Sequence, residues 1–310
     1  MKKGRMAAAI ALPVITVTGL LDVSERLYNF VFDRVDEVPA TSADKQKYAQ
    51  QYYDYVDWLH TQPTRTWYLN PNTDNQLAAT YVPAAKATKD VVIIAHGYKG
   101  NGETMANYAK MFHDLGFNVL LPDSRAHGQS TGKYITFGWL DRLDYLDWLN
   151  KIIEAVGNDC RIILFGVSMG GATVEMLSGE QLPPQVKVII ADCGYSNINS
   201  ELTYLLKRLY HLPKYPLLPT VSMINKRRQG FNLKQVSSIE QLQKNHLPIF
   251  FIHGEKDTYV PTEMVEENYA ATAGPKEKWI VKDATHAESF WIDPKAYQAH
   301  VTDFLNRYFN

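Results

Sequence analysis

The chain has 310 residues, of which 45% are hydrophobic and 21% charged, and its formal net charge at pH 7 is -1. This hydrophobic content supports a large buried core, and together with the charged fraction it argues against extended disorder. A net charge near zero gives no overall electrostatic attraction to nucleic acid, so we expect no nucleic-acid partner.

The N-terminus combines positive charge with an uncharged run. Basic residues at positions 2, 3 and 5 precede Met6–Leu21, which contains no charged residue. As a helix this run would reach about 24 Å, slightly less than the hydrocarbon core of a membrane. The same pattern would fit a cleaved signal peptide or a helix packed on the rest of the protein. No good small-residue cleavage site follows the run, however.

We expect residues 1–30 to form a hydrophobic N-terminal segment, with residues 6–21 as an uncleaved single-pass anchor in the cell membrane. Positive charge on the short flank then predicts that the rest of the chain, residues 31–310, lies outside the cytoplasm. A cytoplasmic or secreted protein is the alternative.

Apolar spacing predicts the first elements of the body. Apolar residues three and four positions apart indicate a helix over Ala43–Gln62. Two short apolar segments, Thr66–Leu69 and Leu77–Val82, flank a turn-rich stretch and predict an antiparallel hairpin.

Short, solid apolar runs follow, separated by helical stretches. The runs are Val91–Ala95, Val119–Leu121, Ile162–Phe165, Val188–Ala191, Ile249–Ile252 and Trp279–Val281, and the helices include Thr104–Leu115, Trp139–Val156 and Lys295–Tyr308. Runs that are apolar on both faces predict a mostly parallel central sheet covered by helices on both sides, an α/β fold.

One interval breaks this pattern. More than fifty residues separate the predicted strand ending near Asp192 from the strand starting near Pro248, far more than one crossover helix needs. We expect an insertion over about residues 195–246, after the sixth strand, that lies as a lid over the crevice at the carboxyl edge of the sheet.

The two cysteines, Cys160 and Cys193, lie at the start of one predicted strand and the end of the next. In parallel neighbours their sulfurs would lie at opposite ends of the sheet, so we expect no disulfide. Two cysteines cannot make a zinc site unaided, and we expect no metal.

Gly166-Val167-Ser168-Met169-Gly170 joins an apolar strand to a helical segment. A serine between glycines at such a corner is the pattern of a nucleophile elbow, in which a tight turn lifts the hydroxyl clear of the sheet. Ser168 is therefore a candidate nucleophile, and it needs a base because a free hydroxyl is protonated at neutral pH.

Among nine histidines, His286 alone follows the last predicted strand, on a loop at the carboxyl edge, and it is the candidate base. Asp257, which follows the preceding strand, is the candidate acid, with Asp192 and Glu255 as alternatives. For the histidines that precede a glycine near strand ends, we expect packing of the ring against backbone in turns. These are His96, His127 and His253.

A developing oxyanion needs two hydrogen-bond donors. The backbone amide of Met169 at the predicted helix start is one candidate, since the first amides of a helix have no intrahelical partner. The amide of Tyr98, in the glycine-containing loop His96–Gly100, is the other.

Five motifs then occur in a recognisable order. They are His96-Gly97-Tyr98, Asp123-Ser124-Arg125-Ala126-His127-Gly128-Gln129-Ser130, Gly166-Val167-Ser168-Met169-Gly170, His253-Gly254-Glu255-Lys256-Asp257 and Thr285-His286. From about residue 75 to the C-terminus the chain resembles the α/β-hydrolase superfamily, and specifically bacterial serine hydrolases similar to the serine-aminopeptidase and acyl-esterase branches. Ala126 stands where that family usually has glycine.

The resemblance implies a Ser168–His286–Asp257 catalytic triad, an acyl-enzyme intermediate and no metal or organic cofactor. Many relatives begin with a hydrophobic segment, which favours the anchor. The substrate would be a small-molecule ester or a short peptide. We favour carboxylic ester hydrolysis, because no obvious acidic cluster is present to hold a peptide N-terminus. A peptidase, aminopeptidase or amidase is the alternative.

The charge of the predicted lid adds a further expectation. From Gly194 to Leu247 there are eight basic and two acidic residues, a charge of about +6. We expect this segment either to favour acyl substrates with an anionic group or to lie near an anionic membrane surface.

The sequence disfavours two other classes of protein. A dinucleotide-binding oxidoreductase is disfavoured because Ser168 occupies the place of the middle glycine of Gly-x-Gly-x-x-Gly. A membrane-tethered binding protein without turnover is disfavoured because all three candidate catalytic residues are present.

Overall fold

The computed structural model describes residues 3–38, 43–72 and 75–309, with side chains for 18–38, 46–70 and 75–309. The chain divides into two compact units, and each is described by itself. The smaller unit comprises the residues up to Asp33 together with Ile198–Val236, and the larger comprises Arg34–Asn197 and Ser237 onwards.

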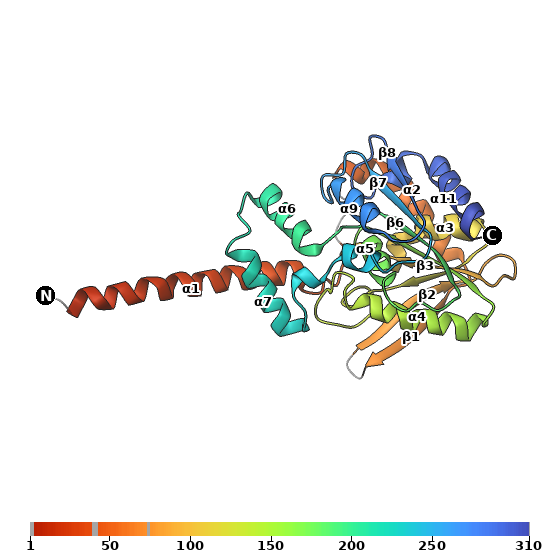
Figure 1. Ribbon diagram of the computed structural model, residues 1–310. Coiled ribbons are helices and arrows are strands. Elements are labelled where there is room, and N and C mark those ends of the chain that lie inside the picture. Colours follow the sequence, from red (N-terminus) through yellow and green to blue (C-terminus); the bar gives the residue numbers. More distant parts are fainter. Residues whose placement is uncertain (1–2, 39–42, 73–74, 310) are drawn as a thin grey trace. The chain divides into compact units, whose positions relative to one another are not determined.

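An eight-stranded sheet forms the centre of the larger unit (Figure 1). Its strands, in spatial order, are β1 (Arg65–Asn72), β2 (Asn75–Val82), β4 (Asn118–Pro122), β3 (Asp90–Ala95), β5 (Arg161–Val167), β6 (Val186–Asp192), β7 (Ile249–Gly254) and β8 (Lys276–Val281). β2 pairs antiparallel with β1 and with β4, and all other neighbours are parallel. The predicted hairpin and mostly parallel sheet are both confirmed.

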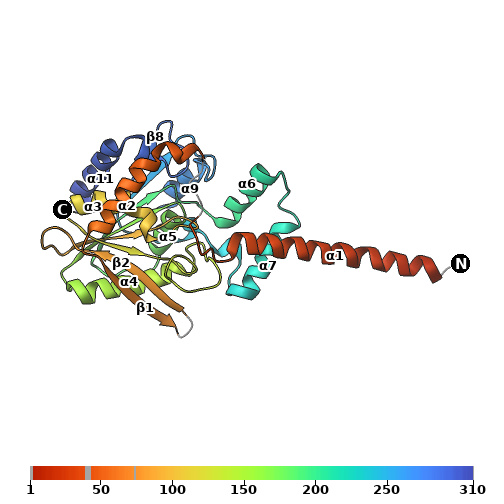
Figure 2. The same ribbon diagram turned by 180° about the vertical axis from the view of Figure 1, so that it is seen from behind.

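Helices cover the two faces of this sheet. The helical elements of the larger unit are η1 (Ala43–Tyr48), α2 (Ala49–Thr61), η2 (Gly102–Met105), α3 (Ala106–Asp114), α4 (Asp141–Val156), α5 (Met169–Leu177), α8 (Ser238–Leu242), α9 (Glu263–Ala271), α10 (Ser289–Ile292) and α11 (Pro294–Tyr308). Figures 1 and 2 show α2, α3 and α11 on one side of the sheet and α4 on the other.

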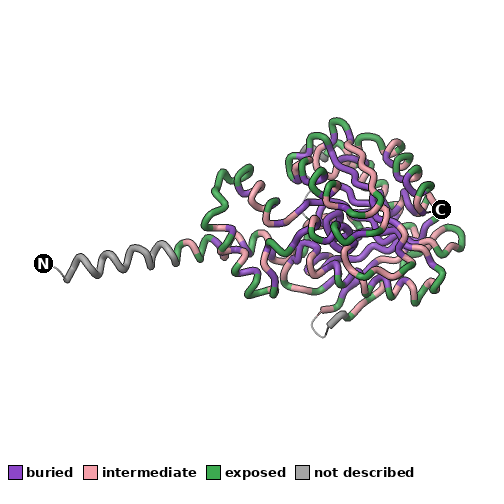
Figure 3. The backbone as a smooth tube through the Cα atoms, viewed as in Figure 1, coloured by how far each residue is buried: buried purple, intermediate pink, exposed green. Residues whose placement is uncertain are grey.

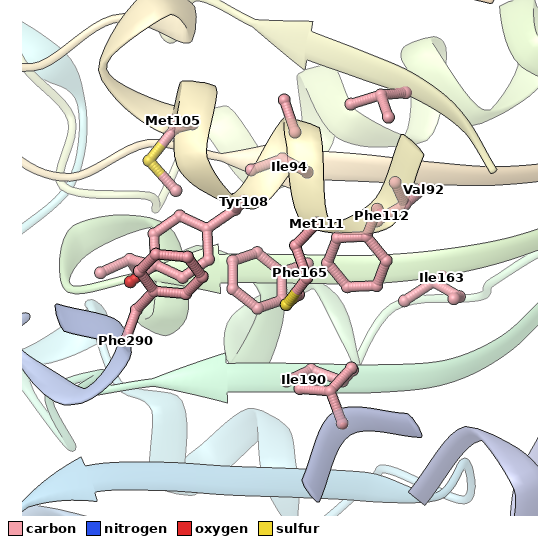
Figure 4. Close-up of a cluster of buried hydrophobic side chains, with 14 of the residues drawn as sticks. Val92, Ile94, Met105, Tyr108, Met111, Phe112, Ile163, Phe165, Ile190 and Phe290 are labelled. Carbon is pink, nitrogen blue, oxygen red and sulfur yellow. The ribbon is translucent and has the colours of Figure 1, made fainter. Parts of the chain in front are cut away.

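Successive side chains of a strand point to opposite faces of the sheet, so a separate core forms under each helical layer. Val92 and Ile94 of β3 join the core formed with α2, α3 and α11, whereas Val91 and Ile93 join the core with α4, α5 and α9. Figure 4 shows the first core, where Tyr108 and other side chains of α3 pack over the strands. Since both faces of each central strand are buried (Figure 3), the strands appear in the sequence as solid apolar runs.

The helix predicted over Thr104–Leu115 is divided in the structure. Asn101 accepts a hydrogen bond from the Thr104 amide and forms a capping box that starts the 3₁₀ turn η2 before α3 begins at Ala106. Similarly, the helix predicted from Trp139 begins at Asp141. These differences move boundaries and leave the order of elements unchanged.

In the smaller unit, α1 (Lys3–Phe32) lies with α6 (Ile198–Tyr210), α7 (Leu217–Gln229) and the turn η3 (Leu233–Gln235). Tyr28 of α1 donates a hydrogen bond to Asn225 of α7 at 3.4 Å, and Arg228 pairs with Glu25. Residues 198–236 of the predicted insertion therefore form one unit with the N-terminal helix, a grouping that the sequence did not indicate, whereas α8 at the end of the insertion belongs to the larger unit. The position of a lid over the crevice stays a prediction.

The predicted anchor falls largely on residues of α1 whose side chains lie outside the described set. Among the described residues, no helix combines the length and the apolar character needed to cross a membrane. The anchor at residues 6–21 is therefore not confirmed.

Both cysteines are buried, and no disulfide joins them. Cys160 precedes β5 and Cys193 follows β6, and these two strands are parallel neighbours.

Candidate active site

Ser168 occupies a strained corner between β5 and α5. Its φ is 59° and its ψ is -118°, a conformation that residues other than glycine rarely adopt. A Cβ atom on Gly166 would collide with the Gly170 carbonyl, and one on Gly170 would collide with the Ala95 carbonyl. Glycines are thus needed on both sides of the serine, and Met169 begins the helix.

The structure brings the three separated candidate residues together at the carboxyl edge of the sheet. Ser168 Oγ lies 2.8 Å from His286 Nε2, and His286 Nδ1 lies 2.8 Å from Asp257 Oδ2. If Nδ1 donates to the carboxylate, Nε2 is left to accept the serine proton. The three side chains form a continuous hydrogen-bonded chain.

The Asp257 carboxylate is buried and held on both oxygens. Oδ1 accepts from the amides of Tyr259 and Val260, each at 2.9 Å, while Oδ2 faces His286 and lies 3.4 Å from His253 Nε2. Burial raises the pKa of Asp257, but the charges and hydrogen bonds of His286 and His253 outweigh it and hold that pKa well below its usual range. The carboxylate therefore stays ionised at neutral pH.

The two alternative acids have other partners. Asp192 accepts hydrogen bonds from Tyr297 at 2.9 Å and from Ser289 at 3.3 Å, and burial raises its pKa to about 6. Glu255 accepts from the amide of Asp283 at 3.1 Å. Of the three candidate acids, Asp257 is the one whose carboxylate accepts the hydrogen bond from His286 Nδ1.

His96 and His127 bind backbone groups near the site, as expected. His96 Nε2 accepts from the amide of Ser124 at 3.0 Å, and His127 Nε2 accepts from the amide of Lys99 at 3.1 Å. Burial lowers the pKa of His127 to about 3, so the ring is neutral and able to accept. These contacts fix the loop that contains Tyr98.

The Asp123 motif supports the same loop. Asp123 Oδ1 accepts from the amide of Gly102 and Oδ2 from the amide of Gln129, each at 2.7 Å. Ala126 has a φ of 61°, in the left-handed region that glycine adopts without strain.

A pocket of about 370 Å³ opens on the serine. Its described lining includes Ser168 and His286, the loop 97–100, and aromatic side chains. These are Tyr48, Tyr52, Tyr98, Tyr108, Tyr259 and Trp291. Lys99 is the one lysine in the described lining, which holds no aspartate or glutamate.

Glu288 is a site residue that the sequence analysis missed. Its Oε2 accepts from the Thr285 amide at 2.9 Å and the Thr285 hydroxyl at 2.7 Å, beside His286. Its Oε1 accepts from Tyr48 at 2.9 Å and pairs with Lys47 at 2.6 Å. Burial raises the pKa of Glu288, but these hydrogen bonds outweigh it and lower that pKa to about 2.

A signal for Glu288 was present in the sequence. Thr285-His286-Ala287-Glu288 has the Thr-x-x-Glu form of a capping box before α10. The pattern predicts the bond from the Thr285 amide, although it does not predict the bonds from the Thr285 hydroxyl, Lys47 and Tyr48.

One group of side chains among the described residues could offer ligands to a metal ion. Atoms of Cys193, Asp257 and His286 lie within 4.8 Å of one another. A metal there would displace the proton that joins His286 to Asp257, so this group gives no independent reason to expect one.

Comparisons with known proteins identify the family of the chain. The model of the Hydrolase_4 family, described as "Serine aminopeptidase, S33", matches residues 86–245. The uncharacterized protein YqkD of Bacillus subtilis is 32% identical over 249 residues, which span 79% of this chain and 80% of YqkD.

Solved structures with a similar fold include hydrolases of different specificity. An esterase from Pyrococcus furiosus gives a TM-score of 0.68 at 22% identity, covering 90% of this chain and 99% of the esterase. An acylaminoacyl peptidase from Pyrococcus horikoshii gives a TM-score of 0.59 at 16% identity, covering 80% of this chain and 42% of the peptidase. The chain has the α/β-hydrolase fold and belongs to the Hydrolase_4 family of S33 serine aminopeptidase-like proteins.

Proposed function

We propose that this protein is a serine hydrolase that cleaves carboxylic esters. The observation that carries the proposal is the chain of two 2.8 Å contacts from Ser168 through His286 to Asp257. Ser168 and His286 of this chain line the pocket. An ionised, buried acid behind a histidine is the arrangement that turns a serine hydroxyl into a nucleophile.

In the proposed mechanism, Ser168 Oγ attacks the ester carbonyl carbon while His286 Nε2 takes its proton. The amides of Met169 and Tyr98 stabilise the negative oxygen of the tetrahedral intermediate. His286 then protonates the departing alcohol, which leaves an acyl group on Ser168. Water, deprotonated by His286, attacks this acyl-enzyme and releases the carboxylic acid.

The pocket supports an ester in preference to a peptide with a free N-terminus. An aminopeptidase needs negative charge near the substrate ammonium group, yet the described lining carries Lys99 and no carboxylate. The aromatic side chains instead suit an apolar acyl or alcohol group.

Peptide cleavage is the second candidate, favoured by the family description and by the acylaminoacyl peptidase among the similar structures. An acylated N-terminus carries no positive charge, so such a substrate would not be repelled by Lys99.

The experiment is a rate comparison between p-nitrophenyl esters of short and long acyl chains, free aminoacyl nitroanilides and acylaminoacyl nitroanilides. We expect turnover of the esters to exceed that of both nitroanilide classes. Faster cleavage of free aminoacyl nitroanilides would overturn the ester proposal, and faster cleavage of acylated ones would select the second candidate. Ser168→Ala is the background control.

A further inference from the structure

The smaller unit carries a segment of ten consecutive exposed residues, 207–216, at the end of α6 and before α7. It is exposed over its whole length (Figure 3). Its sequence is Lys-Arg-Leu-Tyr-His-Leu-Pro-Lys-Tyr-Pro. We call it the exposed segment.

Large apolar side chains of this segment face solvent. Leu209 is 53% exposed, Tyr210 50%, Leu212 41% and Tyr215 65%. The unit buries other apolar residues for its own core, including Leu206, Leu218, Val221 and Ile224. The exposed side chains are therefore surplus to the core, and a cluster of this kind marks an interaction surface.

The charge of the segment selects the partner. Lys207, Arg208 and Lys214 are exposed among these apolar side chains, and no acidic residue occurs between Glu201 and Glu240. Leucine and tyrosine side chains that lie among cations suit the boundary between lipid headgroups and acyl chains, where the rings enter and the cations meet anionic headgroups. A protein groove would have to match these side chains in shape, whereas a lipid surface requires only that apolar and cationic side chains occur together.

We propose that the exposed segment docks the protein on the surface of a membrane rich in anionic lipid. This docking is separate from the hydrolase activity and from the predicted anchor at residues 6–21. Each cation strengthens partitioning about fivefold, so the three together contribute about a hundredfold.

The test uses the full chain with an environment-sensitive fluorophore on Leu212→Cys, because Cys160 and Cys193 are both buried. The label reports where this segment lies even if another part of the chain also binds lipid. The same label on Asn150→Cys, an exposed position of α4, is the matched control. Vesicles are of phosphatidylcholine alone or of phosphatidylcholine with an equal amount of phosphatidylglycerol.

We expect the emission of the label at 212 to shift to the blue, and to be quenched by brominated lipid tails, with phosphatidylglycerol vesicles. The label at 150 should not change. Replacing Lys207, Arg208 and Lys214 by glutamine should raise the lipid concentration needed about a hundredfold. The same change at three exposed lysines of the larger unit, Lys86, Lys89 and Lys295, should have little effect.

A label at 212 that stays in water with phosphatidylglycerol vesicles overturns the proposal, whether or not the protein binds the vesicles. Equal shifts with both vesicle types, unaffected by the glutamine substitutions, overturn the role of charge.

Discussion

Glu288 accepts two hydrogen bonds from Thr285, the residue that precedes His286, and the same carboxylate binds Lys47 and Tyr48 at the start of the body. The loop that presents the imidazole is thereby tied to η1, more than two hundred residues away along the chain. We infer that Glu288 positions His286 through Thr285.

Replacing Glu288 by alanine should lower kcat for a small ester about tenfold or more, because the loss of charged acceptors frees the His286 loop. Glu288→Gln should restore part of the rate, since it keeps an acceptor for Thr285. Steady-state kinetics with a short acyl ester checks this.

Lys47→Met is the matched control for Glu288, because it removes the ion pair and leaves both bonds to Thr285. We expect kcat near that of the wild type. A loss as large as that of Glu288→Ala would show that the ion pair, not the Thr285 contact, carries the effect.

Asp257→Asn should reduce kcat about ten-thousand-fold while the fold is retained. The amide of asparagine can donate to His286 Nδ1, which favours the tautomer in which Nε2 carries the proton and cannot accept another. Kinetics and circular dichroism on the same sample separate a loss of catalysis from a loss of the fold. A variant that retains more than a tenth of the activity would contradict the role of Asp257.

Lys99→Met should alter the preference between charged and neutral esters. Lys99 lines the pocket, and partial burial lowers its pKa, so its charge is poorly solvated and gains from an anionic group nearby. The substitution should lower kcat/KM for p-nitrophenyl hydrogen adipate about tenfold. It should change little for the neutral analogue with an isopropyl group in place of the carboxylate.

Equal losses on the two esters would mean that Lys99 acts on the oxyanion or on packing. Lys99→Arg, which retains the charge, should preserve the preference.

Glu175 predicts a pH dependence of stability. Burial raises its pKa from 4.5 to about 8, and Asn268 donates to it at 3.0 Å. At pH values between these two pKa values, Glu175 therefore holds a proton in the folded state and has released it in the unfolded state. This contribution to stability is fully present below 4.5 and is lost as the pH rises through about 8.

Glu175→Gln removes this dependence because the side chain is neutral throughout. Between about pH 5 and pH 8 the wild type should lose stability relative to the variant, by at most about 1.4 kcal/mol per pH unit. Urea unfolding of both proteins at the two pH values measures the difference, and the exposed Glu154→Gln is the control. Parallel changes in wild type and Glu175→Gln would contradict the assignment.

The sheet could be predicted from the sequence because its strands are buried on both faces. β8 shows the limit: only Trp279–Val281 was predicted, since the preceding Lys276–Lys278 carries the charges of an edge strand and lacks an apolar run. The meeting of Ser168 and His286 followed from strand order, because parallel strands end at one edge.

What the sequence could not predict depends on long-range side-chain contacts. The pairing of Glu288 with Tyr48 joins positions 240 residues apart, and no local spacing encodes it. The grouping of α1 with α7 likewise rests on contacts such as the hydrogen bond from Tyr28 to Asn225. Two polar residues far apart in the sequence give no sign that their helices pack together.

The central claim is that Ser168 is an activated nucleophile, and covalent labelling with a fluorophosphonate tests it most directly. Wild type and Ser178→Ala, a buried serine just after α5, should both carry one adduct that maps to Ser168, and Ser168→Ala should carry none. An unlabelled wild type, or an adduct that persists in Ser168→Ala, would contradict the account.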